Sequence, residues 1–489
     1  MNLSQENYEK IQPIIIAIAE RKGRALLVGG AVRDMVMNDS KSLLIRGPQF
    51  IPTSAIASSG SPCEMKCNIG LNDIDIEVYG LTEQELETIL KQFGPVSLVG
   101  KAFGVLRIHG LDIDWSLPRA DSSGRKPTVT IDPHMSPEDA AQRRDLTMNA
   151  IAFDLVTQEL IDPYGGKDDI KNKILRTPNA RFFIQDPLRF YRVMQFIGRF
   201  EMMPDDELNT ICKNMDISHI SRERIEEEFK KLLLHSKRPS LGIRWLHAIG
   251  RLADVLPELA DTVGVMQEPK WHPEGDVFEH SMQALDAAAK IAKKYDHESD
   301  RLVLLYAALC HDLGKVTTTK TIDGVIKSIG HEKESKKFAR TMLKRITHNA
   351  DLIEAVSSLV LYHMMPLQFT KNNAKIPAYQ RLANKLSPLV DMSMLIDLCI
   401  ADKRGRNGES HDPLDIDFPD VALFKEKVEQ AGVLYSGVEP LLKGADVQDL
   451  VPAGPAMGAL LRQAYEIQIE KNVTDKNILK GLIAQRVKK

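Results

Sequence analysis

Asp73 and Asp75 alternate with Ile74 and Ile76 in the run DIDIEVYG, and this alternation strongly constrains the fold. Residues i and i+2 of a β-strand point to the same face, so a strand here has two carboxylates on one face and two isoleucines on the other. Such a carboxylate pair can share Mg²⁺, which takes oxygen ligands and also binds phosphates. The pattern predicts a sheet with a metal-binding face. Alone it is weak evidence, because solvated acids on an edge strand have the same spacing.

A glycine turn precedes this strand in the stretch LVGGAVRD, residues 27–34. Gly29 and Gly30 form the turn, and Arg33 lies in the first turn of the helix that we expect to follow. Backbone N–H groups at a helix start and an arginine side chain can hold a triphosphate. Together with Asp73 and Asp75, the turn indicates two-metal phosphoryl transfer, in which two ions stabilise the attacking and the leaving oxygen.

A third carboxylate is expected on a neighbouring strand, in the run DIDWSLPR. Asp112 and Asp114 again alternate with apolar residues, and the preceding FGVLRIHG reads as another strand. We take Asp114 as the third carboxylate and Asp112 as its competitor. Arg119 either contacts phosphate or caps the loop.

Length and composition indicate several domains of an ordinary globular protein. The chain has 489 residues, 43% hydrophobic and 27% charged, with a net charge of −3. We expect no membrane span and no signal peptide, and therefore a cytoplasmic protein. Five cysteines argue against a disulfide framework. Cys63 and Cys67 lack the second pair of a zinc site, so ordinary loop thiols are favoured.

The character of the chain changes along its length. Residues 1–155 mix strand-like and helical stretches, interrupted at about 38–71 by a segment rich in Gly, Pro and Ser that reads as a long loop. From Asp186 onward the pattern is helical, and a second helical block begins near Lys270. Lysines and an arginine near the C-terminus suit either RNA contact or a solvated helix face.

Several of these runs, in order, resemble a known family. LVGGAVRD, DID, RRDLTMNAIAFD, IDPYGGKDDI, QDPLRFYRVMQF and SRERIEEEF resemble the class II tRNA nucleotidyltransferases and bacterial poly(A) polymerases. The later runs KWHPEGDVFEHS and CHDLGK resemble the bacterial CCA-adding enzymes that carry a C-terminal HD domain. The resemblance extends from about Leu26 to Asp402, and LVPAGPAMGALL is similar to the family's tail.

The resemblance implies an α+β fold: a polymerase-β-like nucleotidyltransferase head, then an all-helical body that includes an HD domain. We expect the head at 1–155, a nucleotide-selection or neck domain at 156–265, the HD domain at 266–410 and a tRNA-contacting tail at 411–489. In the head it implies Mg²⁺ at Asp73 and Asp75, with Asp114 completing the catalytic set. The nucleotide-binding residues that match are Gly29, Gly30, Arg33 and Arg144. An interdomain salt bridge is the alternative for Arg143 and Arg144.

The family's nucleotide-selecting motif, Glu-Asp-x-x-Arg, matches here with one change. Asp186 and Arg189 correspond and can share a helix face to read the base edges of CTP and ATP. Arg192 lies one turn further, within reach of phosphate or base. Gln185 replaces the glutamate, and Gln195 stands where relatives often have arginine. The alternative for Asp186 is a simple helix cap.

For the HD domain, the resemblance implies a divalent metal of unknown identity at His280, His311, Asp312 and Asp402. Imidazole and carboxylate ligands suit such an ion, whose bound water would attack a phosphate ester. His331 and His363 are further ligands if a second metal binds. Together with His272 they are otherwise ordinary histidines. Lys315, in HDLGK, is a further phosphate contact.

The function implied is template-independent addition of CCA to the 3′ end of tRNA from CTP and ATP, with possible hydrolysis of 2′,3′-cyclic or 2′-phosphates by the HD domain. One alternative is a poly(A) polymerase, or a partial enzyme that adds only CC or only A. The other is a metal-dependent phosphohydrolase whose head is a non-catalytic RNA-binding module.

Overall fold

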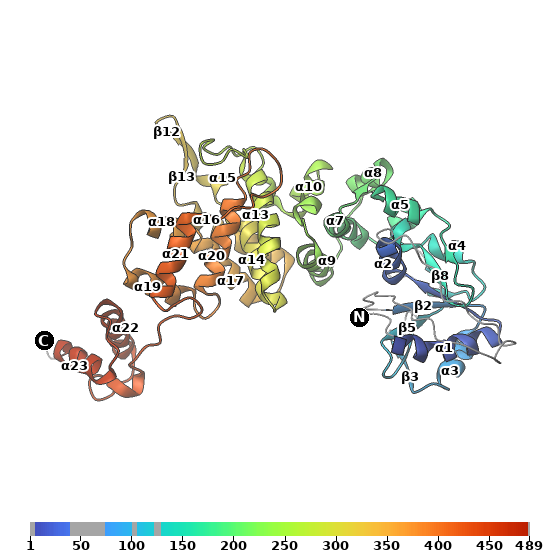
Figure 1. Cartoon of the computed structure of the whole chain (residues 1–489), viewed down its shortest axis with the longest axis horizontal. Coiled ribbons are helices and arrows are strands. Elements are labelled where there is room, and N and C mark those ends of the chain that lie inside the picture. Colours follow the sequence, from blue (N-terminus) through green and yellow to red (C-terminus); the bar gives the residue numbers. More distant parts are fainter. Residues whose placement is uncertain (1–4, 40–73, 100–104, 122–128, 488–489) are drawn as a thin grey trace, which may run out of the picture. The chain divides into compact units, whose positions relative to one another are not determined.

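The computed structural model describes residues 5–39, 74–99, 105–121 and 129–487. These residues divide into two compact units, 1–220 and 221–489, each with its own core (Figure 1). The first mixes strands and helices and the second is helical, as the sequence predicts. Asp73, Cys63, Cys67 and all but the start of the predicted 38–71 loop lie outside the described residues.

A seven-stranded sheet organises the first unit, in the order β3-β4-β5-β2-β1-β8-β9. Its centre is formed by β1 (Arg24–Val28), β2 (Ile74–Tyr79) and β5 (Ile113–Ser116). β2 runs antiparallel to β1 and parallel to β5. The outer strands are β3 (Val96–Val99), β4 (Val105–Ile108), β8 (Ala152–Asp154) and β9 (Leu160–Ile161).

The two faces of this sheet differ, as the alternation in the sequence predicts. Ile74, Ile76 and Trp115 are buried on one face. Helices α1 (Gln5–Glu20) and α3 (Glu83–Leu90) lie on one side of these strands and α2 (Gly30–Asp39) on the other (Figure 1). Asp75 and Glu77 point to the face opposite Ile76, because side chains alternate along a strand.

Shorter elements complete the first unit. The strand pairs are β6 (Arg119–Asp121) with β7 (Val129–Ile131), and β10 (Ile174–Leu175) with β11 (Met203–Pro204). The segment after β7 contains α4 (Pro137–Ala141) and the 3-10 turn η1 (Thr147–Asn149). The helices that follow are α5 (Gly166–Asn172), α6 (Ala180–Phe183), α7 (Leu188–Phe200) and α8 (Asp206–Asn214).

The second unit is built around three central helices, α13 (Val277–Ile291), α14 (Glu298–Cys310) and α20 (Met392–Arg404). The buried face of α14 is mostly leucine and alanine, that of α13 includes four alanines, and that of α20 also has methionine, isoleucine and cysteine. Small and apolar side chains allow the three helices to pack closely. Before them come α9 (Arg222–His235), α10 (Ser240–Ala248), α11 (Leu252–Val255) and α12 (Pro257–Ala260). Around them lie α15 (Lys315–Thr318), α16 (His331–Ile346), α17 (Ala350–Tyr362), α18 (Met365–Lys371), α19 (Ile376–Leu386) and α21 (Pro419–Gln430).

One hairpin interrupts the helical body. β12 (Thr319–Ile322) and β13 (Val325–Ser328) are joined by Asp323 and Gly324, both with positive φ. An Asp-Gly pair between short β-prone runs is a strong hairpin signal, which the expectation of an all-helical body overlooked.

The last segment has a small core of its own. Buried residues of η3 (Gly444–Val447), α22 (Pro455–Glu470) and α23 (Lys476–Val487) form one apolar cluster. Arg381 of α19 pairs with Glu466 and Glu470 of α22.

One described stretch, 350–371, has the length and apolar character of a membrane span, which the sequence analysis did not anticipate. Half of its most apolar window is buried inside the protein. Its first part, α17, packs against α14, α16 and α20, and the stretch carries His363 of the cluster described below. It therefore forms part of the core of this unit.

Candidate functional sites

Asp75 and Asp114 stand opposite each other on the parallel strands β2 and β5. Both are half-buried, and their strand neighbours Ile74 and Ile113 are buried on the other face. The structure therefore brings one of the predicted metal-binding acids next to the predicted third carboxylate. Asp73 directly precedes the first described residue of β2 and is outside the described residues.

The glycine turn lies directly against the Asp75 carboxylate. Val28, the last residue of β1, stands opposite Asp75, and Gly29 follows with φ +74°. A Cβ added to Gly29 would lie 3.5 Å from Asp75 Oδ2. A left-handed φ disfavours any residue with a Cβ. The bend that begins α2 and the acid on the neighbouring strand thus form one local site.

Arg33 is buried at the start of α2 and held on several sides. Its Nη1 donates to Asn149 Oδ1 at 3.0 Å, and its Nε donates to Asp34 Oδ1 at 2.8 Å. The guanidinium also lies 4.6 Å from the ring centroid of Phe200. A Cβ on Gly30 would lie 3.4 Å from Arg33 Nη2, so the predicted phosphate-binding arginine lies beside the glycine turn.

Asp114 and Asp112 differ in exposure and in contacts. The Asp114 side chain is 30% exposed and pairs with Arg107 Nη2 at 2.6 Å, whereas that of Asp112 is 79% exposed and lies 3.6 Å from Arg107 Nη1. Asp114 is on β5 and Asp112 precedes it. This placement favours Asp114 over its competitor as the third carboxylate.

Arg144 lies on the same sheet face as Asp75. Its Nη2 is 3.6 Å from Glu77 Oε1, and Glu77 follows Asp75 by two residues on β2. The neighbouring Arg143 stacks over the ring of Phe182 at 4.4 Å. The Arg144 ion pair therefore lies inside the first unit and is not interdomain.

Asp145 is a buried residue of the same RRD run that the sequence analysis did not single out. It accepts from Arg192 Nε at 2.6 Å and from Asn149 Nδ2 at 2.9 Å. Burial opposes ionisation, but the Arg192 charge and the Asn149 amide bring the pKa of Asp145 down to about 2. Since Asn149 also accepts from Arg33, a continuous polar network joins α2 to α7.

The predicted nucleotide-selecting residues cluster at the start of α7. Asp186 Oδ1 accepts from the N–H of Leu188, the first residue of α7, at 3.2 Å, whereas Pro187 occupies the N-cap position. Arg189 donates to the carbonyl oxygens of Phe182 and Arg143. Gln195, at the position that departs from the family pattern, is buried and accepts from Arg199 Nη1 at 3.1 Å.

In the second unit, the four HD residues of the sequence analysis converge from three places: α13 carries His280, the turn after α14 carries His311 and Asp312, and α20 carries Asp402. His280 Nε2 lies 3.1 Å from His311 Nε2 and 3.1 Å from Asp402 Oδ1. His311 Nε2 is 3.3 Å from Asp312 Oδ2. All four are buried, so the predicted set forms one enclosed cluster.

His331 and His363 extend this cluster through Asp312. Their Nε2 atoms are 3.1 Å apart, and Asp312 Oδ1 lies 3.2 Å from His331 Nε2 and 3.8 Å from His363 Nε2. Asp312 thus faces one histidine group with Oδ2 and the other with Oδ1. The six residues could hold two cations that share the Asp312 carboxylate.

The chemistry of these donors fits a divalent metal. The Nδ1 atoms of His311, His331 and His363 lie 2.7–2.8 Å from backbone carbonyl oxygens. A carbonyl only accepts, so Nδ1 carries a proton, and Nε2 of each ring is the nitrogen that faces the cluster. Converging Nε2 atoms beside carboxylate oxygens form a ligand set for a transition metal.

The charges of the two carboxylates and of His363 agree with this assignment, and His280 differs. Burial opposes ionisation, but Lys315 and His311 hold the pKa of Asp312 well below its usual value. Arg406 and His280 do the same for the pKa of Asp402 against burial. Burial lowers the pKa of His363 to about 3. Burial also disfavours charge on His280, but Asp402 and Glu274 raise its pKa to about 9; a metal ion would have to displace that proton.

Gly314 and the positively charged side chains of Lys315 and Arg406 lie next to the cluster. A Cβ on Gly314 would lie 2.2 Å from His331 O and 2.4 Å from Ser335 N, so only glycine lets the HDLGK turn pack on α16. Lys315 Nζ lies 2.7 Å from Asp312 Oδ2, and Arg406 Nη2 donates to Asp402 Oδ1 at 2.7 Å. Arg406 was not predicted, because no local pattern marks it.

The comparisons with known proteins agree with this architecture. Three family models match: "Poly A polymerase head domain" at residues 25–176, "Probable RNA and SrmB- binding site of polymerase A" at 206–262, and "HD domain" at 277–403. The chain is thus a polymerase-type nucleotidyltransferase head followed by a helical body with an HD domain.

Curated relatives define the family more closely. The multifunctional CCA protein of Stenotrophomonas maltophilia strain K279a is 30% identical over 404 residues, covering 80% of this chain and 93% of the relative. That of Mannheimia succiniciproducens is 30% identical over 396 residues, covering 78% and 84%. The chain therefore belongs to the family of the multifunctional CCA proteins, whose head and HD domains imply the use of divalent metals.

Solved structures support the same fold. A CCA-adding enzyme in complex with CTP has a TM-score of 0.60 at 17% identity and covers 100% of this chain and 99% of its own. The Thermotoga maritima CCA-adding enzyme in complex with tRNA has a TM-score of 0.57 at 18% identity, with 99% and 96% covered. Identities this low show the fold alone.

Proposed function

We propose that this protein adds C, C and A to the 3′ end of tRNA, using CTP and ATP, without a template. The observation that carries the proposal is the placement of Asp75 opposite Asp114 and directly against the Gly29 bend. Carboxylates beside a helix-initiating glycine turn are suited to a metal-bound nucleoside triphosphate. The names of the related CCA proteins support tRNA as the acceptor.

In this proposal Asp73 and Asp75 hold Mg²⁺, and Asp114 completes the site. Bound Mg²⁺ would offset the charge of the triphosphate and of the pyrophosphate that leaves. The 3′-oxygen of the tRNA forms a bond to the α-phosphorus, and the bond between that phosphorus and the bridging oxygen to the β-phosphate breaks. Asp114 is placed to help remove the proton of the 3′-hydroxyl.

The nucleotide is held by backbone and arginine groups. The N–H groups of Gly29 and Gly30 and the side chain of Arg33 bind the triphosphate. Arg144 makes an additional contact to the nucleotide. Asp186 and Arg189 read the base by paired hydrogen bonds, with Arg192 beside them. Each of these side chains has protein partners in the structure, so nucleotide binding exchanges some of these contacts for contacts to the ligand.

Product analysis separates this function from its alternatives. A tRNA that ends before the CCA tail is incubated with CTP alone, ATP alone and both, and the products are sequenced. We expect CC from CTP alone and CCA with both nucleotides. Open-ended A tails would identify a poly(A) polymerase, and an unextended tRNA would support a phosphohydrolase with a non-catalytic head.

We propose that the HD domain hydrolyses 2′,3′-cyclic or 2′-phosphates, with divalent metal held by His280, His311, Asp312 and Asp402 and a second ion at Asp312, His331 and His363. A bound metal would supply the activated water, while Lys315 and Arg406 are placed to attract the phosphate. The test measures opening of 2′,3′-cyclic CMP and release of phosphate from 2′-CMP after reloading with Co²⁺, Ni²⁺, Mn²⁺ or Mg²⁺. If neither substrate is hydrolysed with any of these metals, the domain is a scaffold.

We also propose the cytoplasm as its location, as for its tRNA substrate, and the division 1–155, 156–265, 266–410 and 411–489. The head and HD family matches lie mostly within the first and third parts.

A further inference from the structure

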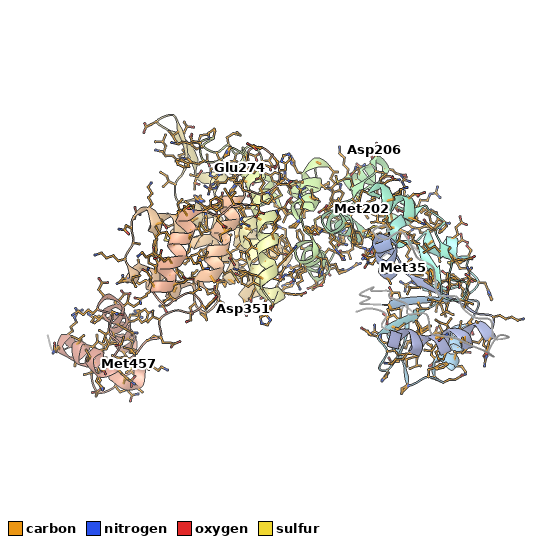
Figure 2. All side chains as sticks on the ribbon, viewed as in Figure 1. Met35, Met202, Asp206, Glu274, Asp351 and Met457 are labelled. Carbon is orange, nitrogen blue, oxygen red and sulfur yellow. The ribbon has the colours of Figure 1, made fainter. Side chains whose placement is uncertain are left out.

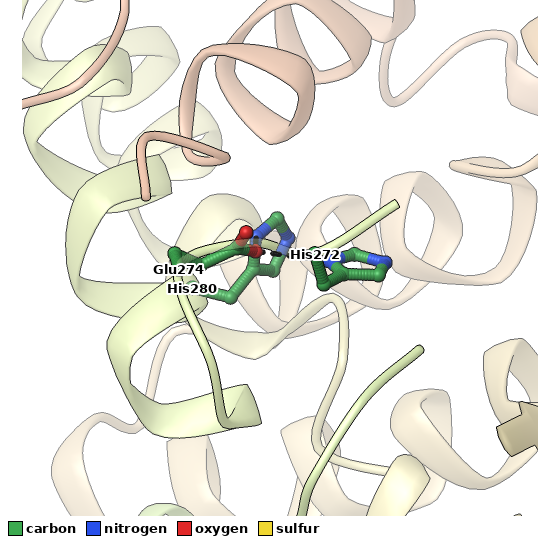
Figure 3. Close-up of side chains that lie close together, drawn as sticks. All are labelled: His272, Glu274 and His280. Atoms are coloured by element: carbon green, nitrogen blue, oxygen red, sulfur yellow. Dashed lines mark hydrogen bonds and ion pairs between the residues drawn. The ribbon is translucent and has the colours of Figure 1, made fainter. Parts of the chain in front are cut away.

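Glu274 lies behind the metal-facing histidine His280, just before α13 (Figures 2 and 3). Its Oε1 is 2.7 Å from His280 Nδ1 and 2.9 Å from His272 Nδ1. The Glu274 side chain is 0% exposed and that of His272 is 14% exposed. One buried carboxylate oxygen therefore accepts from two imidazoles.

This arrangement distinguishes His280 from the other histidines of the cluster. His311, His331 and His363 each direct Nδ1 to a backbone carbonyl at 2.7–2.8 Å. The carbonyl of Gly405 is 3.1 Å from His280 Nδ1, and the carboxylate is closer. Because Gly405 O can only accept, Nδ1 bears the proton, and His280 turns Nε2 to Asp402 and His311.

A second imidazole, that of His272, holds the carboxylate in place. The two imidazole rings meet edge to face, with centroids 5.0 Å apart. His272 thus fixes the oxygen that in turn fixes His280.

We propose that Glu274 is a positioning residue for the HD metal site: it holds His280 in the Nδ1–H form and strengthens Nε2 as a metal ligand. A carboxylate behind a ligating histidine fixes the ring and raises its basicity, and loss of such a partner weakens metal binding by about 10–100-fold. The inference rests on the proposed HD function for the metal, but not on any particular substrate.

An alternative role for His272, Glu274 and His280 is to form a separate metal site, since their ligand atoms lie close together. That site would need both nitrogens of His280 free of protons, with Nε2 serving one ion and Nδ1 another. The approach of Gly405 O to Nδ1 opposes this, because two acceptors would then face each other.

The test compares Co²⁺ binding by the full-length wild type, Glu274→Gln and Glu274→Ala. Gln keeps the shape and one acceptor but removes the charge. Affinity is measured by competition with a chelator, and the visible absorption of bound Co²⁺ reports its ligands. We expect Co²⁺ to bind about tenfold more weakly to Glu274→Gln and up to about 100-fold more weakly to Glu274→Ala, with an altered spectrum in both.

Glu268→Gln is the matched control. Glu268 is in the same loop, and its side chain accepts from the Ile326 N–H. Its main-chain carbonyl accepts from the His272 N–H, and the variant keeps that hydrogen bond. This variant should bind Co²⁺ within twofold of wild type. CCA addition by every variant should stay unchanged, which shows that the head is folded, and an unchanged helical circular dichroism spectrum shows the same for the helical unit.

The outcomes separate the two proposals. Weaker Co²⁺ binding by the Glu274 variants, with no hydrolysis of 2′,3′-cyclic CMP or 2′-CMP even by wild type, would support the positioning role of Glu274 and refute the HD activity. Co²⁺ affinity and spectrum equal to wild type in both variants would overturn the positioning role, whatever the activity. Wild type that binds no Co²⁺ at this cluster would overturn both.

Discussion

Asp75 of β2 and Asp114 of β5 are register partners on parallel strands, although 38 residues separate them in the sequence. The isoleucines beside them are buried on the other face, so the alternation leaves the carboxylates no other direction. Burial of the apolar residues thereby fixes the position of the acids. The predictions below test what these and other contacts do.

Replacing Asp114 should affect chemistry more than folding. If Asp114 helps remove the proton of the 3′-hydroxyl, Asp114→Asn should lower the single-turnover rate of CTP incorporation by about 10²–10⁴-fold. The exposed neighbour provides the control, because Asp112→Asn should keep the wild-type rate. Equal losses in the two variants would mean that Asp114 has no special role.

Gly29 is required both for its backbone angle and for the space beside Asp75. Gly29→Ala places a Cβ in left-handed backbone at a cost of about 1–2 kcal/mol and 3.5 Å from Asp75 Oδ2. We expect a clear rise in the KM for CTP and a lower kcat. Gly110→Ala has the same backbone strain, at φ +84°, with nothing within 4 Å, and should leave the kinetics of CTP addition unchanged. A Gly29→Ala enzyme with normal kinetics would argue against a nucleotide site at this bend.

The Asp145 ion pair should stabilise α7 in a pH-dependent way. The folded-state pKa of about 2 lies below the usual value of 3.8. Its contribution, about 2 kcal/mol, is therefore complete above pH 4 and is lost as the pH falls toward 2. Asp145→Asn should remove it already at pH 7, seen as faster hydrogen exchange of α7 amides. Unchanged exchange in the variant would show that the pair does not hold this helix.

Replacing Gly314 should affect the HD cluster but not CCA addition. Gly314→Ala forces a Cβ into the backbone of His331 and Ser335, neither of which can move without displacing α16. We expect loss of metal from the HD cluster, measured by Co²⁺ titration, while CCA addition stays within twofold of wild type. Full metal binding by this variant would show that the turn can rearrange.

The sequence predicts local features of this structure better than contacts between residues that are distant in the chain. The strand alternation around Asp75 and Asp114 is local, and burial enforces it, so both strands and their faces were predictable. The HD histidines were recognised from family order, because no spacing rule joins residues as distant as His280 and Asp402.

The contacts that were missed depend on tertiary packing. Asp145 and Glu274 lie within motifs that the sequence analysis identified. The partner of Asp145, Arg192, comes from α7, and the contacts of Glu274 with His272 and His280 depend on a turn whose geometry the spacing does not specify. The β12–β13 hairpin is different, since its Asp-Gly turn was visible in the sequence and was overlooked beneath a helical pattern.

The most direct test of the central claim is CTP incorporation by Asp75→Ala, measured on a tRNA that lacks CCA. If acids beside the Gly29 bend hold cations against the triphosphate, this variant should add no cytidine above background, while wild type and Asp112→Ala extend the tRNA fully. Undiminished incorporation by Asp75→Ala would contradict the account.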